Sequence, residues 1–383
     1  MDERLKKLAV WTARTILGAT FIFSGFVKAI DPLGTQYKIQ DYAAAVGAAE
    51  YLPDWATLLS SVVLSAFELS VGAFMLLAVA RRLVSRLALL FMAAMTAVTL
   101  WIWIDDPVKD CGCFGDAVSL TNGETLSKNI ILTILAFAAA RWPLSAGRLM
   151  SRAAQWTVVQ AVPVACVMLS LWCLYDLPLI DFRPYHVGAD IKAGMEIPDN
   201  AEQPVIETTF VMEKDGVRKE FSLDNYPDST WTFVDSRSVT VKEGYVPPIQ
   251  DFAVIDNTGE DITDEILSDK DYVFLLVSPS LEHADDQNFG SIDQIYEYCQ
   301  DHRYTFVCLT ASGDEAIARW RELTGAEYPF CNTDATTLKT VIRSNPGLVV
   351  LKHGVVVGKW SHNRLPEPED FDKILGGAAA KKK

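Results

Sequence analysis

Long uncharged apolar runs alternate with short charged segments through the first half of the chain. The clearest runs are residues 87–104 and 153–175, and each is long enough to cross a bilayer core of about 30 Å at about 1.5 Å per residue. Three further runs cover about residues 9–30, 55–80 and 126–142, and the last of these is the shortest. The pattern predicts five membrane-spanning helices.

A cleavable signal peptide is the alternative interpretation of the first run, because Arg4, Lys6 and Lys7 precede it. However, the run contains Arg14, is longer than a signal-peptide core, and lacks a cleavage site of the small-x-small type. We therefore expect the first run to be retained as a membrane helix.

The charge of the connecting segments alternates in sign. Lys and Arg gather before the first run, between the second and third, and between the fourth and fifth, whereas the other two connections are acidic. Positively charged loops stay in the cytoplasm, so we expect a cytoplasmic N-terminus and an extracytoplasmic C-terminal half. In a bacterium this describes a multi-pass inner-membrane protein, in contact with membrane lipid, with a periplasmic domain.

The two halves of the chain differ in composition. Residues 1–180 carry 14 Lys and Arg against 13 Asp and Glu, whereas residues 181–383 carry 20 against 36. Half of all residues are hydrophobic and the net charge is −15, which excludes a disordered chain and argues against a nucleic-acid partner. An apolar membrane half is followed by an acidic, water-soluble half.

The connection between the third and fourth runs contains the most specific motif, Cys111-Gly112-Cys113-Phe114-Gly115. Two cysteines separated by one residue close a disulfide only in a tight, strained ring, and strain makes such a bond easy to exchange. This favours redox chemistry at Cys111 and Cys113. Two alternatives stay open, namely a pair of unreactive thiols and a soft-metal site for Cu(I) or Zn. No nearby histidine completes a metal-binding set, so we expect no metal.

Three features together indicate a family: the segment FSGFVKAIDP at residues 23–32, Glu68 in the second run, and the Cys111–Gly115 motif. They resemble the DoxX-like membrane proteins, and within that group the methylamine-utilisation proteins of the MauE type. The resemblance covers about residues 8–145. It implies a four-helix bundle that works in thiol–disulfide chemistry outside the cytoplasm beside a thioredoxin-like partner, with the fifth run as an added tether.

Glu68 is expected near the middle of the membrane, where an ionisable group is costly unless it is paired or solvated. A protonated Glu68 hydrogen-bonded within the bundle is one interpretation. Lys28 either extends to the membrane surface or turns inward toward Glu68. A polar site formed by Glu68 and Lys28 could also hold a quinone headgroup, which a thiol oxidase needs as electron acceptor.

Cys166 and Cys173 share one helix face and are expected to pack, although Cys173 could act as a resolving thiol.

Residues 181–246 show short alternating runs that predict a β-rich module. The strongest signal is a hairpin in which strands at about 208–213 and 217–221 flank the turn Asp215-Gly216. We find no candidate chemistry in this module.

Alternating strands and helices follow from residue 247. We expect strands at about 252–256, 272–278, 305–310, 347–352 and 355–360, and helices at about 288–302, 314–324, 335–342 and 367–375. This order of elements, with Pro247-Pro248 at its start and Ser344-Asn345-Pro346-Gly347 before a strand, resembles a thioredoxin-like domain. Pro346 occupies the place of the cis-proline in that family.

The domain departs from the family in its redox motif. A thioredoxin-type site is a Cys-x-x-Cys at the start of the first helix, but residues 278–283 read SPSLEH. Cys299 and Cys308 fit structural roles, and Cys331 is the one exposed thiol we expect. The domain is therefore predicted to be redox-inactive and to bind an extracytoplasmic protein partner in the groove beside Asn345 and Pro346.

The predicted protein is multi-domain: an α-helical transmembrane bundle (1–150), a fifth span (151–180), a β-rich module (181–246), an α/β thioredoxin-like domain (247–376) and a disordered tail (377–383). The leading hypothesis is a membrane component of extracytoplasmic thiol–disulfide metabolism that exchanges or relays disulfides through Cys111 and Cys113. The competing hypothesis is a non-enzymatic envelope docking protein, or scaffold, whose Cys-Gly-Cys loop is structural.

Overall fold

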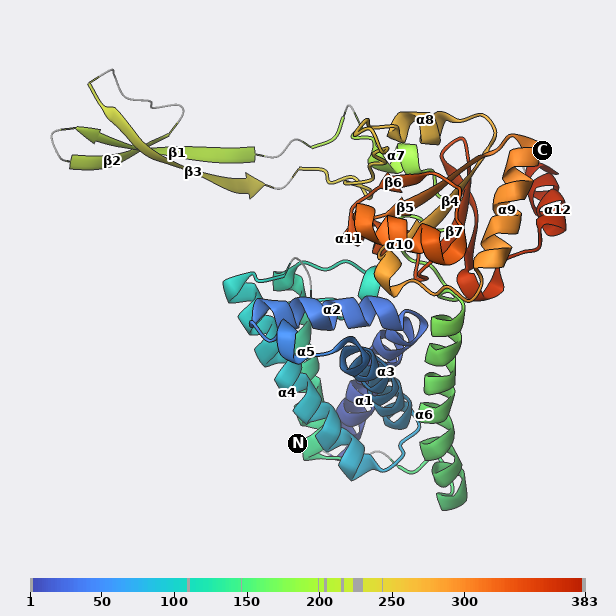
Figure 1. Cartoon of the computed structure of the whole chain (residues 1–383). Coiled ribbons are helices and arrows are strands. Elements are labelled where there is room, and N and C mark those ends of the chain that lie inside the picture. The colour runs from blue at the N-terminus through green and yellow to red at the C-terminus, as the bar shows by residue number, and fades with distance from the viewer. Residues whose placement is uncertain are drawn as a thin grey trace.

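The computed structural model describes residues 3–108, 111–145, 147–198, 200–202, 205–214, 217–222, 230–242 and 244–380. It has three parts (Figure 1): a helical bundle, an α/β domain seated on one end of the bundle, and a three-stranded sheet that projects from that domain. We call the end of the bundle below the α/β domain the domain-facing end.

The bundle contains α1 (Glu3–Ile30), α3 (Asp54–Leu76), α4 (Arg81–Asp105) and α5 (Asn122–Arg141), and α6 (Arg152–Tyr175) packs beside α3 and leads into the α/β domain (Figure 1). Among the described helices, α1, α3, α4 and α6 are long and apolar enough to cross a membrane. The helix α5 is not one of them, although it packs along α4 and α1. The structure thus supports a multi-pass membrane protein, and the five-span topology remains a prediction.

Glycines let α1 and α3 approach each other closely. A Cβ atom at Gly25 would lie 2.4 Å from the backbone nitrogen of Leu69, and one at Gly72 would lie 2.6 Å from that of Ile22. Real side chains do not tolerate such distances, so these two positions need glycine. Small residues at a helix crossing are a common basis of packing between membrane helices, because lipid provides no hydrophobic drive for their association.

Arg14, the charged residue inside the first apolar run, is fully buried and caps the end of α3. Its Nε and Nη2 donate hydrogen bonds of 2.9 and 2.7 Å to the carbonyl oxygen of Met75. The last carbonyls of a helix lack partners within the helix, so Arg14 satisfies one of them where α3 ends and the chain turns into α4.

The helix α2 (Pro32–Ala45) was not predicted, and it lies across the domain-facing end of the bundle (Figure 1). Its start follows the rules for helix termini: the Asp31 carboxylate accepts a hydrogen bond from the Gly34 N–H, and Pro32 stands at the first helical position. The short turn η1 (Ala49–Tyr51) then connects α2 to α3.

The projecting sheet contains β1 (Val205–Lys214), β2 (Val217–Ser222) and β3 (Thr232–Lys242), paired antiparallel in the order β2-β1-β3. The predicted turn at Asp215-Gly216 lies outside the described residues. Residues 181–195, which we assigned to this module, pack on the α/β domain instead. The helix α7 (Ile191–Met195) begins beside a bridge between Asp190 and Val355, and Tyr185 and Ile191 are buried in the core of the α/β domain.

The α/β domain is built on a five-stranded sheet of order β6-β5-β4-β7-β8. The central β4 (Tyr272–Ser278) pairs parallel with β5 (Thr305–Thr310) and antiparallel with β7 (Gly347–Lys352). The edges are β6 (Phe330–Asn332) and β8 (Val355–Ser361). One face is covered by α9 (Phe289–His302), α10 (Asp314–Thr324) and α12 (Pro368–Ala380), and the other by α7, α8 (Thr263–Ser268) and α11 (Ala335–Val341).

The predicted elements of this domain are confirmed with few exceptions. Strands at 272–278, 305–310 and 347–352 have the expected bounds. The expected strand at 252–256 is wrong: this segment makes only isolated bridges, from Ile255 to Asp261 and to Asn332. The helix α12 continues to Ala380, beyond its expected end near residue 375 and into the expected disordered tail, and 381–383 lie outside the described residues.

Candidate functional site

The thiol loop, residues 111–115, lies at the domain-facing end of the bundle between α4 and α5. The Sγ atoms of Cys111 and Cys113 are 2.6 Å apart, and neither cysteine is in a disulfide. Cys111 is buried, whereas Cys113 is partly exposed. Gly112 has φ +62°, in the left-handed region that favours glycine. The turn at Gly112 therefore brings the two sulfurs together as a disulfide requires.

Two helices hold the backbone of the thiol loop. Lys28, in the last turn of α1, donates a hydrogen bond of 2.7 Å from Nζ to the carbonyl oxygen of Cys113. Tyr42, in α2, donates a hydrogen bond of 2.6 Å from Oη to the carbonyl oxygen of Cys111. Each cysteine is thus fixed by a hydrogen bond from a different helix.

Below the loop, Lys28 and Glu68 form a buried ion pair. Nζ of Lys28 lies 2.9 Å from Oε2 of Glu68, and Oγ of Ser24 lies 2.6 Å from Nζ and 2.7 Å from Oε2. The inward orientation of Lys28, one of the two that the sequence allowed, is confirmed. An isolated buried charge is costly, so the two groups stabilise each other, and Lys28 connects this ion pair to Cys113.

The loop makes the two thiols different. The hydrogen bond from Cys113 lowers the pKa of Cys111 to about 7 against the opposing effect of burial, with further help from Tyr42, Lys128 and Lys28. The same contact and burial raise the pKa of Cys113 well above its usual value. Because the thiolate is the reactive form, Cys111 is the nucleophile of the reduced pair.

A cavity of about 240 Å³ adjoins both thiols inside the bundle. Its polar side contains Ser24, Lys28, Glu68, Lys128 and Asn129 beside Cys111 and Cys113. Its apolar wall includes Phe21, Phe91, Met92, Met95 and Leu132. The Nζ of Lys128 lies 4.0 Å from the centroid of the Phe114 ring, which closes the cavity next to the loop. The site can therefore hold a small, largely apolar molecule against the thiol pair.

The other cysteines do not join this site in the described contacts. Cys166 and Cys173 are buried in α6, consistent with packing. In the α/β domain, burial raises the pKa of Cys299, Cys308 and Cys331. The expectation that Cys331 is exposed is wrong, because Cys331 belongs to β6 and is 5% exposed. None of these three thiols is activated.

The Asn345–Pro346 peptide bond is cis, as the thioredoxin resemblance implies. The side chain of Asn345 is already engaged within the domain: it donates 2.8 Å to the carbonyl oxygen of Ser280 and accepts 2.7 Å from the Ser278 hydroxyl. Its carbonyl oxygen also accepts from the N–H of Asp285, 3.0 Å away. Partner binding at Asn345 and Pro346 remains a prediction, and a partner at Asn345 would have to replace these contacts.

Sequence reasoning missed three polar residues around the thiols: Ser24, Tyr42 and Lys128. Ser24 lies in the segment that carried the family resemblance, so its position was a usable signal. Tyr42 and Lys128 gave none, because they come from α2 and α5, and only the folded chain brings them to the loop. Within the described residues, no group of three or more His, Cys, Asp or Glu side chains could hold a metal ion.

The thiol loop, Lys28 and Glu68 all lie in a segment that matches one known family model. Residues 6–142 match the family model "Methylamine utilisation protein MauE". This MauE-type segment spans α1 to α5 and includes both thiols. The likeness to the wider DoxX-like group stays an expectation. Residues 206–243, which cover the projecting sheet, match a domain of unknown function, DUF8463.

Similarity to individual proteins beyond the MauE-type segment is low. No curated protein matches the chain significantly. A solution structure from Bacteroides thetaiotaomicron, described as a "putative protein disulfide isomerase", is 15% identical, covers 33% of this chain and 82% of its own, and has a TM-score of 0.26. The strand order and directions in the α/β domain agree with those expected for a thioredoxin-like domain.

Proposed function

We propose that the chain is a membrane thiol–disulfide oxidoreductase, in which Cys111 and Cys113 exchange disulfides with an extracytoplasmic protein partner. One observation carries the proposal: the two sulfurs lie 2.6 Å apart and the pKa of Cys111 is lowered to about 7. A purely structural pair needs no activated thiol. The match of residues 6–142 to the MauE family supports a membrane setting for this chemistry.

The two pKa values suggest the order of events. In the oxidised pair, an incoming thiolate attacks Sγ of Cys113, because this breaks the Cys111–Cys113 bond and releases Cys111, the better leaving thiolate. Cys113 is also the more exposed residue of the two. A second thiolate of the partner then attacks the mixed disulfide. The partner leaves as a disulfide, and the pair keeps two electrons as a thiol and a thiolate.

Reoxidation needs an acceptor of two electrons, and we propose a membrane quinone, which would take one proton from the thiol of the pair and one from its surroundings. The cavity of about 240 Å³ is smaller than the roughly 300–1,000 Å³ of typical ligand sites, so it suits a single ring-sized headgroup. Its apolar wall suits a lipid-soluble ring. Lys28, Lys128 and Asn129 offer hydrogen-bond donors beside the thiols. The role of these residues would be to orient the ring and keep water from the reacting sulfurs.

The membrane orientation is part of the proposal. Alternating loop charge supports a cytoplasmic N-terminus and a periplasmic α/β domain in a bacterial inner membrane. The thiol loop and the α/β domain lie at the same end of the bundle (Figure 1), so both would face the oxidising compartment. The α/β domain, with no activated thiol, would then act by binding rather than by exchange.

A trapping experiment tests the proposal. In a Cys111→Ser variant, Cys113 can form a mixed disulfide with an oxidised partner, and Cys111 is no longer present to attack it and release the partner. We expect covalent complexes to accumulate on Cys111→Ser in native membranes, fewer on Cys113→Ser, and none on the double variant. A Cys173→Ser variant, altered outside the loop, is the control and should behave as the unsubstituted protein.

A redox titration separates the two hypotheses further. A pair with a reduction potential above about −230 mV is poised for exchange, whereas one below about −300 mV resists reduction as structural disulfides do. Absence of complexes on both single variants, together with a potential below about −300 mV, would support the docking protein with a structural Cys-Gly-Cys loop.

A further inference from the structure

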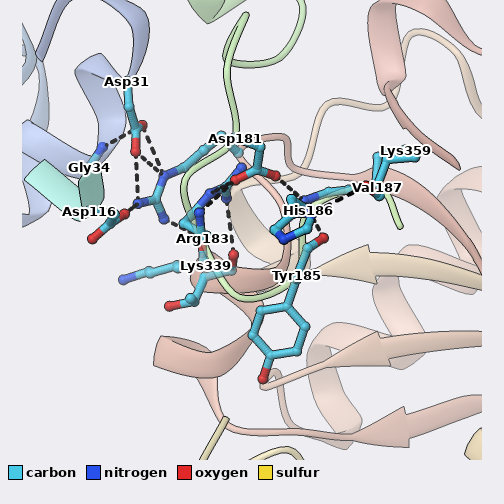
Figure 2. Close-up of polar contacts among 12 residues, drawn as sticks. Asp31, Gly34, Asp116, Asp181, Arg183, Tyr185, His186, Val187, Lys339 and Lys359 are labelled. Carbon is cyan, nitrogen blue, oxygen red and sulfur yellow. Dashed lines mark hydrogen bonds and ion pairs between the residues drawn. The ribbon is translucent and has the colours of Figure 1, made fainter. Parts of the chain in front are cut away.

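The α/β domain makes direct polar contact with the bundle beside the thiol loop. Arg343, between α11 and β7, extends from the domain to the carboxylates of Asp31 and Asp116 in the membrane segment. Both carboxylates are labelled in Figure 2. The Nε of Arg343 lies 2.9 Å from Oδ1 of Asp31, and its Nη2 lies 2.9 Å from Oδ2 of Asp31 and 3.3 Å from Oδ2 of Asp116. Arg343 is 7% exposed in its side chain, so the guanidinium is buried in this contact.

Both carboxylates are close in sequence to the residues that form the site. Asp116 lies in η2 (Gly115–Ala117), three residues after Cys113. Asp31 follows the end of α1, three residues after Lys28, whose Nζ binds the carbonyl oxygen of Cys113. The guanidinium therefore joins one end of the thiol loop to the end of the helix that supports the loop.

Contacts from both the domain and the bundle fix Arg343. Its Nη1 donates to the carbonyl oxygen of Lys339, and its guanidinium lies 5.4 Å from the ring centroid of Tyr37 in α2. Gly34 leaves room for the contact, because a Cβ there would lie 2.4 Å from Oδ2 of Asp31 and 2.9 Å from Nη2 of Arg343. Arg343 thus has little freedom to adopt another position while the domain is docked.

The docked loop presents different groups on its two sides. A cleft of about 260 Å³ between the domain and the bundle is lined by Gly112, Gly115 and Arg343, but not by the cysteines. Cys111 and Cys113 line the cavity inside the bundle. In this arrangement the sulfurs adjoin the membrane cavity, while the loop backbone faces the side from which a soluble protein would approach.

We infer that Arg343 is a positioning residue that holds the thiol loop closed through Asp116 and Asp31, so that release of this contact exposes the thiols to a protein partner. The α/β domain would thereby control when the pair faces the bundle cavity and when it faces the partner. This role of Arg343 rests on the proposed disulfide exchange. Its effect on the accessibility of the thiols can be measured whether or not exchange occurs.

Alkylation of the reduced, full-length protein tests the inference. We expect Arg343→Gln to raise the alkylation rate of the thiol pair at least threefold and Arg343→Lys to raise it less, since a lysine keeps the charge but loses the forked geometry. Arg364→Gln is the matched control. It removes another contact between domain and bundle, the 2.7 Å pair with Asp176 at the end of α6, far in sequence from the loop.

A second variant covers the case in which Arg343→Gln fails to fold. Asp116→Asn alters a side chain that is 45% exposed and removes only the loop end of the contact, so we expect it to raise the alkylation rate in the same direction. The pH profile distinguishes opening from unfolding: an opened loop keeps the alkylation midpoint near pH 7, whereas an unfolded chain shifts it toward about 8.5.

Two results would overturn the inference: unchanged rates in both Arg343→Gln and Asp116→Asn, or an equal rise in Arg364→Gln, which would show general loosening of the domain. The alkylation rate of the reduced protein does not depend on disulfide exchange with a partner. Trapped complexes with unchanged alkylation rates would reject only the positioning role. Raised alkylation rates without any trapped complex would reject only the exchange function.

Discussion

Cys111 and Cys113 have the same side chain, and the loop gives them different acidities. Cys111 receives the hydrogen bond from its neighbour and the field of two lysines, whereas Cys113 is the donor and its pKa is raised. The lowered pKa of Cys111 depends on Cys113 more than on the other surrounding groups, because the hydrogen bond with Cys113 has the largest effect on it. This makes the acidity of Cys111 sensitive to a change two residues away.

We therefore expect the pH dependence of alkylation to report on the pair. In the reduced protein, Cys111 should react half-maximally near pH 7, the pKa of its thiol. Cys113→Ala should move this midpoint upward, toward the usual thiol value of about 8.5, while Cys331→Ala, in the α/β domain, should leave it unchanged. An unmoved midpoint in Cys113→Ala, measured by mass spectrometry of the alkylated peptide, would contradict the assignment.

At the scale of single residues, the sequence could identify the thiols but not their surroundings. The Cys-Gly-Cys spacing, Lys28 and Glu68 were apparent because they lie in recognisable segments. Arg343 was not, since it is 312 positions from Asp31 and no local pattern relates the two. The prediction that Cys331 is exposed was wrong, because β6 has only three residues and so short a strand shows no alternation of polar and apolar residues from which burial could be inferred.

Among the helices, the contact between α1 and α3 shows how the bundle can form without a hydrophobic drive. The two backbones meet at Gly25 and Gly72, and the resulting approach also brings Lys28 and Glu68 to within 2.9 Å. The packing of these two helices and the polar site below the thiols therefore have a common origin.

Gly72→Ala should destabilise the bundle. The added methyl group would lie 2.6 Å from the backbone nitrogen of Ile22, and overpacking of this kind costs about 1–3 kcal/mol. Thermal unfolding in detergent should show a lowered midpoint. Gly123→Ala is the control, since its methyl group would make an ordinary contact of 3.5 Å with Trp103. Equal midpoints for the two variants would contradict the role of close packing.

Element prediction succeeded where burial made the pattern clear. The strands β4, β5 and β7 are buried along their lengths, and their continuous apolar runs gave correct bounds. The helix α2 was overlooked because its residues are of mixed polarity, although Asp31 and Pro32 carried a usual start signal. Residues 181–195 were assigned to the wrong part because their partners, such as Val355, lie far along the chain.

Across the whole molecule, charged contacts join parts that the sequence presents as separate. Besides Arg343, the carboxylate of Asp181 accepts from Nε of Arg183 at 2.7 Å and from Nζ of Lys359 at 2.6 Å (Figure 2). Arg183 in turn donates 3.0 Å to the carbonyl oxygen of Thr340 in α11. This network fixes the segment after α6 to the domain, so the connection is not a free linker.

The docking contact should weaken in acid. Burial alone would raise the pKa of Asp31, but Arg343 outweighs it and the pKa is lowered. The stabilisation from Asp31 is therefore complete above about pH 4, the usual value for Asp, and is lost as the pH falls through the lowered pKa. At pH 7, Asp31→Asn should cost toward the low end of roughly 3–5 kcal/mol, because it leaves Arg343 with less compensation.

Thermal unfolding of both proteins from pH 7 to pH 3 checks this expectation. The difference in midpoint between the unsubstituted protein and Asp31→Asn should shrink below about pH 4. A difference that stays constant down to pH 3 would show that the charge of Asp31 does not act through this contact. Asp264→Asn, at an exposed position in α8, is the control and should show no such convergence.

The attachment of the α/β domain through α6 has a kinetic consequence. The domain and its docking surface belong to one chain, and α6 ends beside that surface, where Ser361 and Asn363 bind the carbonyl oxygen of Tyr175. Rebinding after release is therefore intramolecular, with an effective concentration in the millimolar range or above for short connections. Opening of the site would not depend on how much protein the membrane holds, and a free copy of the domain would compete poorly with the attached one.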